Sequence, residues 1–291
     1  MPAFDVIVCG SLHLDIMIYA PALPRLDETT VGTRWAQQCG GKGGNQAVMA
    51  ARANARTAMI GRVGDDDFGR RLLAHLEAAR VDTRAVGVDP VAGSGMSAAI
   101  VREDGEYGAV IVSGANLELA PADAAKAWAQ IGGAKVLVLQ NEIPDLVNAA
   151  AARAARAEGG LTILNAAPAR VLFAGLGGLI DVLIVNRVEA EMMGGGALRD
   201  EAGARHAIAA LSPLCANVIV TLGGEGSFVK TAEGAIHRIA PKPVKVVSTH
   251  GAGDCFVGSL AAKLAQGGCL IEAAEFANSA AAAHVSRLFP S

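Results

Sequence analysis

The sequence predicts an α/β protein built on a doubly wound, mainly parallel sheet. Two observations favour this fold class. Short runs of apolar and β-branched residues alternate with helical patterns along most of the 291 residues, and several of these runs are continuously apolar. Strands covered by helices on both faces of a parallel sheet have this composition. The alternation of strand and helix indicates right-handed β–α–β connections within one sheet.

The expected elements follow one another in a regular order. Strands are expected at Phe4–Cys9, Thr57–Ile60, Lys135–Leu139, Leu161–Asn165, Val182–Asn186 and Asn217–Leu222. Helices are expected between or after them, at Asn45–Ala55, Asp66–Ala79, Pro121–Ile131, Leu146–Ala157, Asp200–Leu211 and Ala252–Ala265. Pro121 suits the first turn of its helix because its ring fixes a helical φ. Asp200 suits an N-cap because its carboxylate can accept hydrogen bonds from the free backbone N–H groups of the first turn.

Two segments, at about 16–39 and 94–113, interrupt this order. The first is extended and rich in proline, and the second contains two strand patterns within Met96–Val112. An Asp-Gly pair inside 103–106 favours a hairpin turn between them. The two segments predict a small antiparallel sheet inserted into a single domain that spans residues 1–291. A lid over a site and an edge extension of the main sheet are both consistent with this pattern.

Composition narrows the class of protein. A hydrophobic content of 52% with 18% charged residues excludes a disordered chain, and a net charge of −3 gives no basic surface for nucleic acid. We see neither an uninterrupted apolar run long enough to span a membrane nor a signal peptide. The five cysteines are scattered without a CxxC pair, which is typical of a reducing compartment. We therefore expect a cytoplasmic protein with no membrane or nucleic-acid partner.

The glycine-rich sequence Gly251-Ala252-Gly253-Asp254 directly precedes an expected helix. Small residues leave backbone N–H groups uncovered at a helix N-terminus, which makes a site for an anion such as a phosphoryl group. Asp254 can be interpreted in two ways. It could cap the helix, for which aspartate is favoured, or it could act as a base that removes a proton from an attacking hydroxyl.

Two further glycine clusters suggest ligand contacts. Residues 39–46 form a run in which Lys42 is followed by Gly43, so this is not a Walker A loop. Its paired glycines allow a ligand to approach the backbone, and Lys42 and Asn45 can donate to sugar hydroxyls, although a flexible loop would have the same composition. The third cluster, Thr221–Gly226, ends a strand, and taken alone it would favour a tight turn over a ligand contact.

Glu142 and Asn186 also stand just after expected strands. Ligands of open α/β sheets bind at the carboxyl ends of the strands, so these clusters and polar residues should line one crevice.

Taken together, these motifs resemble the ribokinase (PfkB) family of ATP-dependent sugar and nucleoside kinases, and most closely its ribokinase branch. The matching sequences occur in family order along nearly the whole chain: GSLHLD at 10–15, GGKGGNQAVMAA at 40–51, GRVGDDDFG at 61–69, SGAN at 113–116, QNE at 140–142, NAAPAR at 165–170, NRVE at 186–189, TLGGEG at 221–226 and GAGD at 251–254. Each motif alone is weak, but their number and order are specific.

The resemblance implies a ribokinase-like, Rossmann-type fold with a β lid that is often shared in a homodimer. It also implies transfer of the ATP γ-phosphoryl group to a primary hydroxyl with Mg²⁺ as cofactor. By motif match, Asp254 is the base, and the amides of Gly251, Ala252 and Gly253 form the anion hole. The sugar-binding set is His13, Asp15, Gly41, Lys42, Asn45 and Glu142. Asn186, Thr221, Gly223, Gly226 and Asn278 bind the nucleotide, and Glu189 holds Mg²⁺ indirectly through water.

The chain departs from the family pattern at three places. Ser248 stands where ribokinases commonly have an aspartate that holds an activating K⁺, and the sequence stops at Ser291, before a loop that also lines that cation site in ribokinases. A hydroxyl replaces a carboxylate poorly around a desolvated cation, so we expect weak or absent activation by K⁺. His13 stands where ribokinases usually have an asparagine that contacts ribose. It could set a different sugar specificity or merely border the pocket.

D-Ribose is therefore the leading substrate, and two alternatives remain. The first is a kinase of the same family for a nucleoside (adenosine, inosine or pseudouridine) or for another sugar. A nucleoside kinase would need an apolar base pocket, which Met17, Trp35 and Met96 could line. A non-catalytic sugar- or nucleotide-binding regulator would not need the base in the GAGD motif, so the intact motif argues against it.

Overall fold

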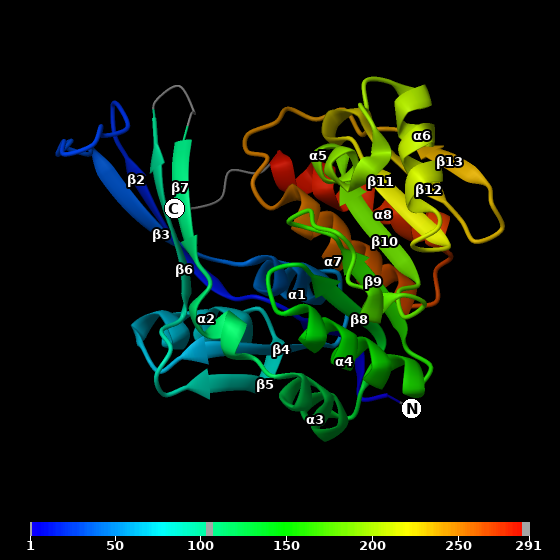
Figure 1. The fold of residues 1–291 in the computed structure, drawn as a ribbon, viewed down its shortest axis with the longest axis horizontal. Helices are drawn as coiled ribbons and strands as arrows, with labels where there is room; N and C mark the ends of the chain where they lie inside the picture. Colours follow the sequence, from blue (N-terminus) through cyan, green and yellow to red (C-terminus); the bar gives the residue numbers. More distant parts are fainter. Residues whose placement is uncertain (1, 103–106, 287–291) are drawn as a thin grey trace.

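The computed structural model describes residues 2–102 and 107–286 of the chain, and within them the strands form a nine-stranded and a four-stranded sheet. The strand order of the large sheet is β13-β12-β11-β10-β9-β8-β1-β4-β5, and all pairs from β11 to β5 are parallel. Its strands are β1 (Phe4–Cys9), β4 (Thr57–Gly64), β5 (Val81–Asp89), β8 (Ala134–Gln140), β9 (Leu161–Asn165), β10 (Val182–Asn186), β11 (Asn217–Thr221), β12 (Ser227–Lys230) and β13 (Ile236–Ile239). The mainly parallel α/β fold is therefore confirmed (Figure 1).

Helices cover both faces of the large sheet. The described α-helices are α1 (Lys42–Arg52), α2 (Asp67–Ala78), α3 (Pro121–Ile131), α4 (Asp145–Ala157), α5 (Arg187–Ala190), α6 (Glu201–Leu211), α7 (Ala252–Ala265) and α8 (Leu270–Val285). Alternate residues of β1 point to opposite faces. Val6 and Val8 join a buried cluster with α1, α2, α7 and α8, whereas Ile7 and Cys9 join one with α3, α4 and α6. This two-sided burial explains why the strand sequences are continuously apolar.

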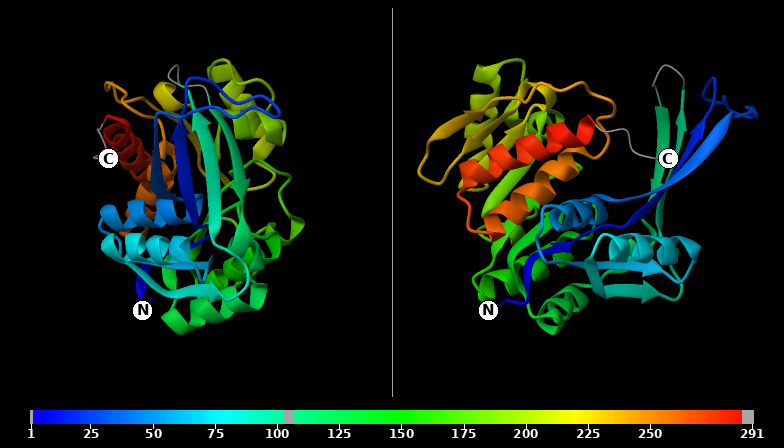
Figure 2. Two further views of the ribbon diagram at one scale, coloured as in Figure 1. Left: turned by 90° about the vertical axis from the view of Figure 1, so that its left-hand side faces the viewer. Right: turned by 180° about the vertical axis from the view of Figure 1, so that it is seen from behind.

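The small sheet is formed by the two interrupting segments. Its strands are β2 (His13–Tyr19), β3 (Arg34–Gly40), β6 (Gly95–Val101) and β7 (Tyr107–Val112), in the order β3-β2-β6-β7. The predicted antiparallel pairing holds for β2–β3 and β6–β7, whereas the central strands β2 and β6 pair in parallel. The hairpin turn expected at 103–106 lies outside the described residues. Figure 2 shows this sheet standing to one side of the helical layers.

The element predictions are largely confirmed, and the omissions have physical causes. Asp200 caps α6 by accepting from the backbone N–H of Gly203, as expected. β5, β12, β13, α5 and α8 were not predicted. β5 and β13 lie at the edges of the large sheet, where partly exposed strands lose the apolar signature. α8 is alanine-rich, so its buried and exposed faces differ little in polarity. Among the described residues, no helix is long and apolar enough to cross a membrane.

Candidate active site

Four polar side chains gather where neighbouring parallel strands end. Gln140 pairs in register with Asn165 at the ends of β8 and β9, and Asn186 pairs with Thr221 at the ends of β10 and β11. The N-termini of α1 and α7 lie at the same edge, because Asn45 of α1 and Asp254 of α7 are in direct contact there. This is the crevice that the sequence predicted.

Asp254 is the central titratable group of this crevice. Its Oδ2 accepts a hydrogen bond from Asn45 Nδ2 at 3.0 Å, and its Oδ1 accepts one from Gln46 Nε2 at 2.9 Å. Burial raises the pKa of Asp254; the nearby charge of Lys42 and the two amide donors lower it, and Glu142 raises it again, with a net upward shift. Both hydrogen bonds of the side chain are made to α1, although Asp254 is also the acidic residue in the first turn of its own helix. The capping and base interpretations of Asp254 both remain predictions.

Gln46 fixes the position of the Asp254 carboxylate. Its buried amide nitrogen donates to both Asp254 and Asn165 Oδ1 (3.1 Å), and its oxygen accepts from Gln140 Nε2 at 2.7 Å. Both amide hydrogens and the oxygen are thus used, so the amide has one orientation. Unpaired buried polar groups are costly, and this chain of bonds therefore resists rearrangement.

Glu142 holds the start of α1. Its Oε2 accepts from the backbone N–H of Lys42 at 3.0 Å and from the hydroxyl of Ser11 at 2.5 Å. Gly41 precedes the helix with φ of 82°, and a Cβ there would lie 2.7 Å from the backbone nitrogen of His13. The glycine run is thus required for α1 to press against the 11–13 backbone, and Lys42 is thereby brought to the edge of the crevice.

His13 and Asp15 lie on β2, and neither lines the two cavities described below. His13 is 4% exposed, and within the described part of the chain its Nε2 has no hydrogen-bond partner. Asp15 accepts from the hydroxyl of Ser97 on β6 at 2.5 Å, and a Cβ at Gly40 would clash with its carboxylate. The sugar-binding role of these two residues remains a prediction.

Asn186 and Glu189 form a reciprocal cap at the start of α5. Asn186 Oδ1 accepts from the Glu189 N–H, and Glu189 Oε2 accepts from the Asn186 N–H, each at 2.8 Å. Burial raises the pKa of Glu189; the Asn186 N–H and Lys42 lower it, and Asp254 raises it, for a net upward shift. No group of three or more His, Cys, Asp or Glu side chains that could hold a metal ion by themselves occurs among the described residues.

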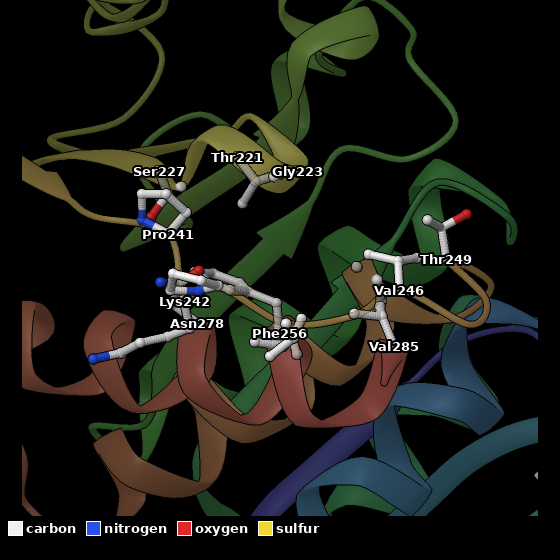
Figure 3. Close-up of a pocket in the computed structure, with 18 residues that line it drawn as sticks. Thr221, Gly223, Ser227, Pro241, Lys242, Val246, Thr249, Phe256, Asn278 and Val285 are labelled. Carbon is white, nitrogen blue, oxygen red and sulfur yellow. The ribbon is translucent and has the colours of Figure 1, made fainter. Parts of the chain in front are cut away.

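Two adjoining cavities meet at the N-terminus of α7. The smaller, about 190 Å³, is lined by Lys42, Asn186, Glu189, Asp254 and the Gly251–Gly253 segment. The larger, about 420 Å³, lies between the 221–227 loop and α8 (Figure 3). Both share a common set of lining residues, Thr221, Thr249, Ala252, Gly253 and Phe256. The backbone at 252–253 therefore stands between a polar and a mainly apolar compartment.

Most of the predicted nucleotide-binding residues line the larger cavity rather than the smaller one. Thr221, Gly223, Gly226 and Asn278 line the larger cavity, and the amide of Asn278 is held by donation to the Ala240 carbonyl at 2.7 Å. Sequence reasoning missed Ser11, Gln46, Asn165 and Thr249. Ser11, Gln46 and Asn165 lie inside the quoted motifs, and Thr249 lies just before GAGD. Their residue types alone do not indicate a functional role, but their positions in or beside the motifs could have identified them.

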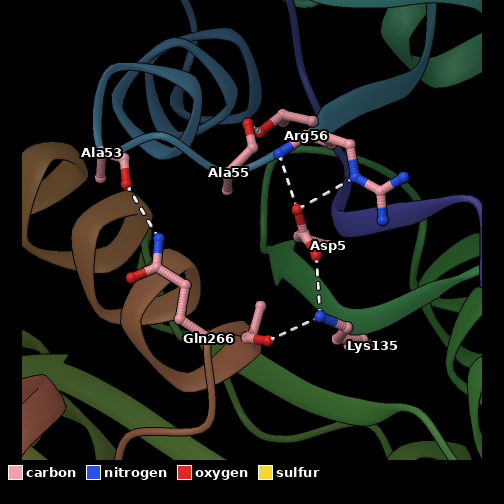
Figure 4. Close-up of polar contacts among 8 residues, drawn as sticks. Asp5, Ala53, Ala55, Arg56, Lys135 and Gln266 are labelled. Carbon is pink, nitrogen blue, oxygen red and sulfur yellow. Dashed lines mark hydrogen bonds and ion pairs between the residues drawn. The ribbon is translucent and has the colours of Figure 1, made fainter.

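A second polar cluster lies at the opposite, amino-terminal edge of the large sheet (Figure 4). Asp5 accepts from Lys135 Nζ at 2.9 Å and from the Arg56 backbone N–H at 3.0 Å, and Lys135 also donates to the Ala265 carbonyl. Burial raises the pKa of Asp5, but the donors Lys135 and Arg56 outweigh it and hold that pKa below its usual value. These groups tie β1, β4, β8 and the end of α7 together, so the cluster is structural.

Comparisons with known proteins show similarity along nearly the whole chain. The family described as pfkB family carbohydrate kinase matches residues 3–288. A ribokinase of Mus musculus is 37% identical over 266 residues, which cover 90% of this chain and 82% of that protein. A deoxyribokinase of Salmonella typhi is 32% identical over 266 residues, with coverages of 91% and 87%. The structure of Arabidopsis thaliana ribokinase complexed with ribose and ATP superposes with a TM-score of 0.89 at 28% identity, covering 96% of this chain and 92% of the other.

Replacement of Gln46 tests the buried network. Gln46→Met keeps the side-chain length but removes a donor to Asp254 and leaves Gln140 Nε2 without its acceptor. We expect the free energy of unfolding in urea to fall by about 1–3 kcal/mol. The control is Gln38→Met on β3, where the glutamine is exposed and the change should be within about 0.5 kcal/mol. Equal stability of the two variants would contradict the proposed importance of the network.

Proposed function

The chain belongs to the pfkB family of carbohydrate kinases and is an ATP-dependent sugar kinase, and we propose that its substrate is D-ribose. The observation that carries this proposal is the contact of Asp254 with Asn45 and Gln46 beside the Gly251–Gly253 amides. This arrangement places a carboxylate next to a helix N-terminus, as transfer of a phosphoryl group to a hydroxyl requires. Similarity to ribokinases over nine-tenths of the chain supports ribose as the acceptor.

In the proposed reaction, Asp254 accepts the proton of the attacking sugar hydroxyl. The raised pKa of Asp254 makes its ionised form a better proton acceptor than an ordinary aspartate. The backbone N–H groups of Gly251 and Gly253 would stabilise charge on the transferring phosphoryl group, and Lys42 adds a positive charge at the same cavity. The N–H of Ala252 donates to the Thr249 carbonyl at 3.2 Å and would join them once that bond is exchanged for the ligand. The hydroxyl oxygen forms the new P–O bond as ADP leaves.

The larger cavity is proposed to hold the nucleotide. Its apolar wall, which includes Val246, Phe256 and Val285, suits the faces of a purine base, and Thr221, Gly223 and Gly226 lie toward the phosphates. Mg²⁺, when bound, neutralises phosphate charge. Because no described acidic cluster could hold the ion alone, it would take most ligands from phosphates and water. The second carboxylate oxygen of Glu189 suits such a water, and Asn186 keeps that side chain in place.

The small sheet is proposed to be a lid and a homodimer interface. It stands beside the crevice and exposes apolar side chains in the described part of β3 and β7, including Trp35 at 66% and Val110 at 67%. Such exposure is typical of a surface that another chain covers. We further propose a cytoplasmic location, which is supported by the absence of a disulfide bond among the five cysteines of the described residues.

Activation by K⁺ is proposed to be weak. Ser248 offers one hydroxyl in place of a carboxylate, and that hydroxyl accepts from the His250 N–H at 3.2 Å. We expect ribose phosphorylation to proceed at rates within about threefold in Na⁺ and in K⁺, because a neutral hydroxyl offsets the desolvation of a cation less than a carboxylate does. Initial rates at equal ionic strength test this, and a large increase in K⁺ would refute it.

Asp254→Asn tests the proposed base. The amide keeps the size of the side chain but cannot take a proton, so kcat should fall by about 10²–10⁴-fold. ADP release from Mg·ATP and ribose measures the rate, and circular dichroism verifies the fold. Asp123→Asn is the matched control, because Asp123 also lies in the first turn of a helix but far from the cavities. A near-normal kcat for Asp254→Asn would eliminate the base role.

The substrate proposal is tested with a panel of acceptors for wild type and His13→Asn. The panel contains D-ribose, 2-deoxyribose, other pentoses, fructose derivatives, adenosine, inosine and pseudouridine. We expect the wild-type kcat/KM to be highest for ribose. If the unpartnered ring nitrogen of His13 faces the sugar, the variant should change the ratio of ribose to the other acceptors by about tenfold or more, the value of one hydrogen bond.

Selective use of a nucleoside or of another sugar by the wild type would overturn ribose as the substrate. An unchanged preference in His13→Asn would show that His13 only borders the pocket. Lack of turnover with every acceptor would favour the non-catalytic sugar- or nucleotide-binding regulator.

A further inference from the structure

The segment that leads into the proposed anion hole has little support from regular structure. Residues 240–251 connect β13 to α7 without forming a helix or strand, and most of the side chains from Lys242 to His250 are exposed. Gly251 at its end has a φ of 71°, in the left-handed region that glycine adopts most easily. Without other contacts, a segment of this kind would leave the Gly251 N–H poorly oriented.

The last turn of α8 provides those contacts. The carbonyl oxygen of Val285 accepts from the N–H groups of Val247 and Ser248 at 2.8 and 3.2 Å. One residue earlier, Nε2 of His284 lies 2.9 Å from the carbonyl oxygen of His250. A carbonyl can only accept, so Nε2 carries the proton and donates. The imidazole also packs over the next residue, since a Cβ at Gly251 would lie 3.3 Å from Nε2.

The hydrogen bond acts on the first donor of the anion hole. The carbonyl of His250 and the N–H of Gly251 belong to one planar peptide group, so fixing the direction of one fixes that of the other. Donation to the carbonyl also polarises the peptide and strengthens its N–H as a donor. His284 is 8% exposed and lines neither described cavity, so it would act on the reaction only through this peptide.

We propose that His284 is a positioning residue for phosphoryl transfer, which orients and polarises the His250–Gly251 peptide so that the Gly251 N–H points at the transferring group. This inference rests on the proposed anion hole at 251–253. Its effect is confined to the transition state, where charge develops on the phosphoryl oxygens. Loss of the donor should therefore lower kcat far more than it changes KM for ATP or sugar.

The test compares three replacements of His284. His284→Ala removes the donor and the ring, His284→Phe keeps most of the volume without a donor, and His284→Gln places an amide nitrogen the same number of bonds from Cα as Nε2. We expect kcat to fall about 10- to 100-fold in the Ala and Phe variants, as for a displaced anion-hole donor. The Gln variant should recover to within about threefold of wild type.

The matched control is His237→Ala, because His237 is exposed on β13 and its loss should leave kcat unchanged. Wild-type kcat in His284→Phe would overturn the proposal, since packing alone would then suffice. Failure of His284→Gln to recover while its thermal midpoint equals that of wild type would also overturn it.

The proposed substrate is tested separately from His284. The variants are compared with whichever acceptor the wild type phosphorylates, so failure with ribose alone overturns ribose and leaves the His284 comparison in force. A wild-type protein that transfers phosphate to no acceptor would overturn the anion hole and this inference together.

Discussion

The structure depends on surrounding the partly buried carboxylate of Asp254 with hydrogen-bond donors and a positive charge. A buried anion is costly unless donors and a positive charge surround it. Asn45, Gln46 and Lys42 provide them, and all three come from α1, so α1 must lie against the start of α7. Gly258 makes this approach possible, because a Cβ there would stand 2.5 Å from the carbonyl oxygen of Gln46.

Carboxylates are compensated by neighbouring donors at both edges of the large sheet, but only one edge adjoins the two described cavities. At the carboxyl edge, amides and carboxylates face a polar cavity that adjoins an apolar one, so charge is placed where a ligand can reach it. At the amino edge, Asp5 is neutralised by Lys135 and Arg56, and its contacts tie the strands to the end of α7. Helix α7 thus runs from the site at its first turn to a structural anchor at its last.

Much of this could be predicted from the sequence, because the signals were local. The span of α7 and its Gly251–Asp254 entry follow from neighbouring residues. The bond between Gln46 and Asp254 joins residues 208 positions apart, and neither the 3.6-residue nor the two-residue period carries such information. The contact of His284 with His250 was hidden for a similar reason, since α8 has weak amphipathic character. The parallel pairing of β2 with β6 also depends on the tertiary fold.

The most direct test of this account is the pH dependence of kcat/KM for the sugar acceptor. The pKa of Asp254 is raised above the ordinary aspartate value of about 3.9, and only its ionised form can accept a proton. As the pH is lowered, kcat/KM should therefore begin to fall at a higher pH than an ordinary aspartate would give. Glu189→Gln should keep this acid limb, which separates Asp254 from Glu189, a buried carboxyl whose pKa is also raised. A kcat/KM that stays constant through the ordinary aspartate range, while circular dichroism shows a folded protein, would contradict the account.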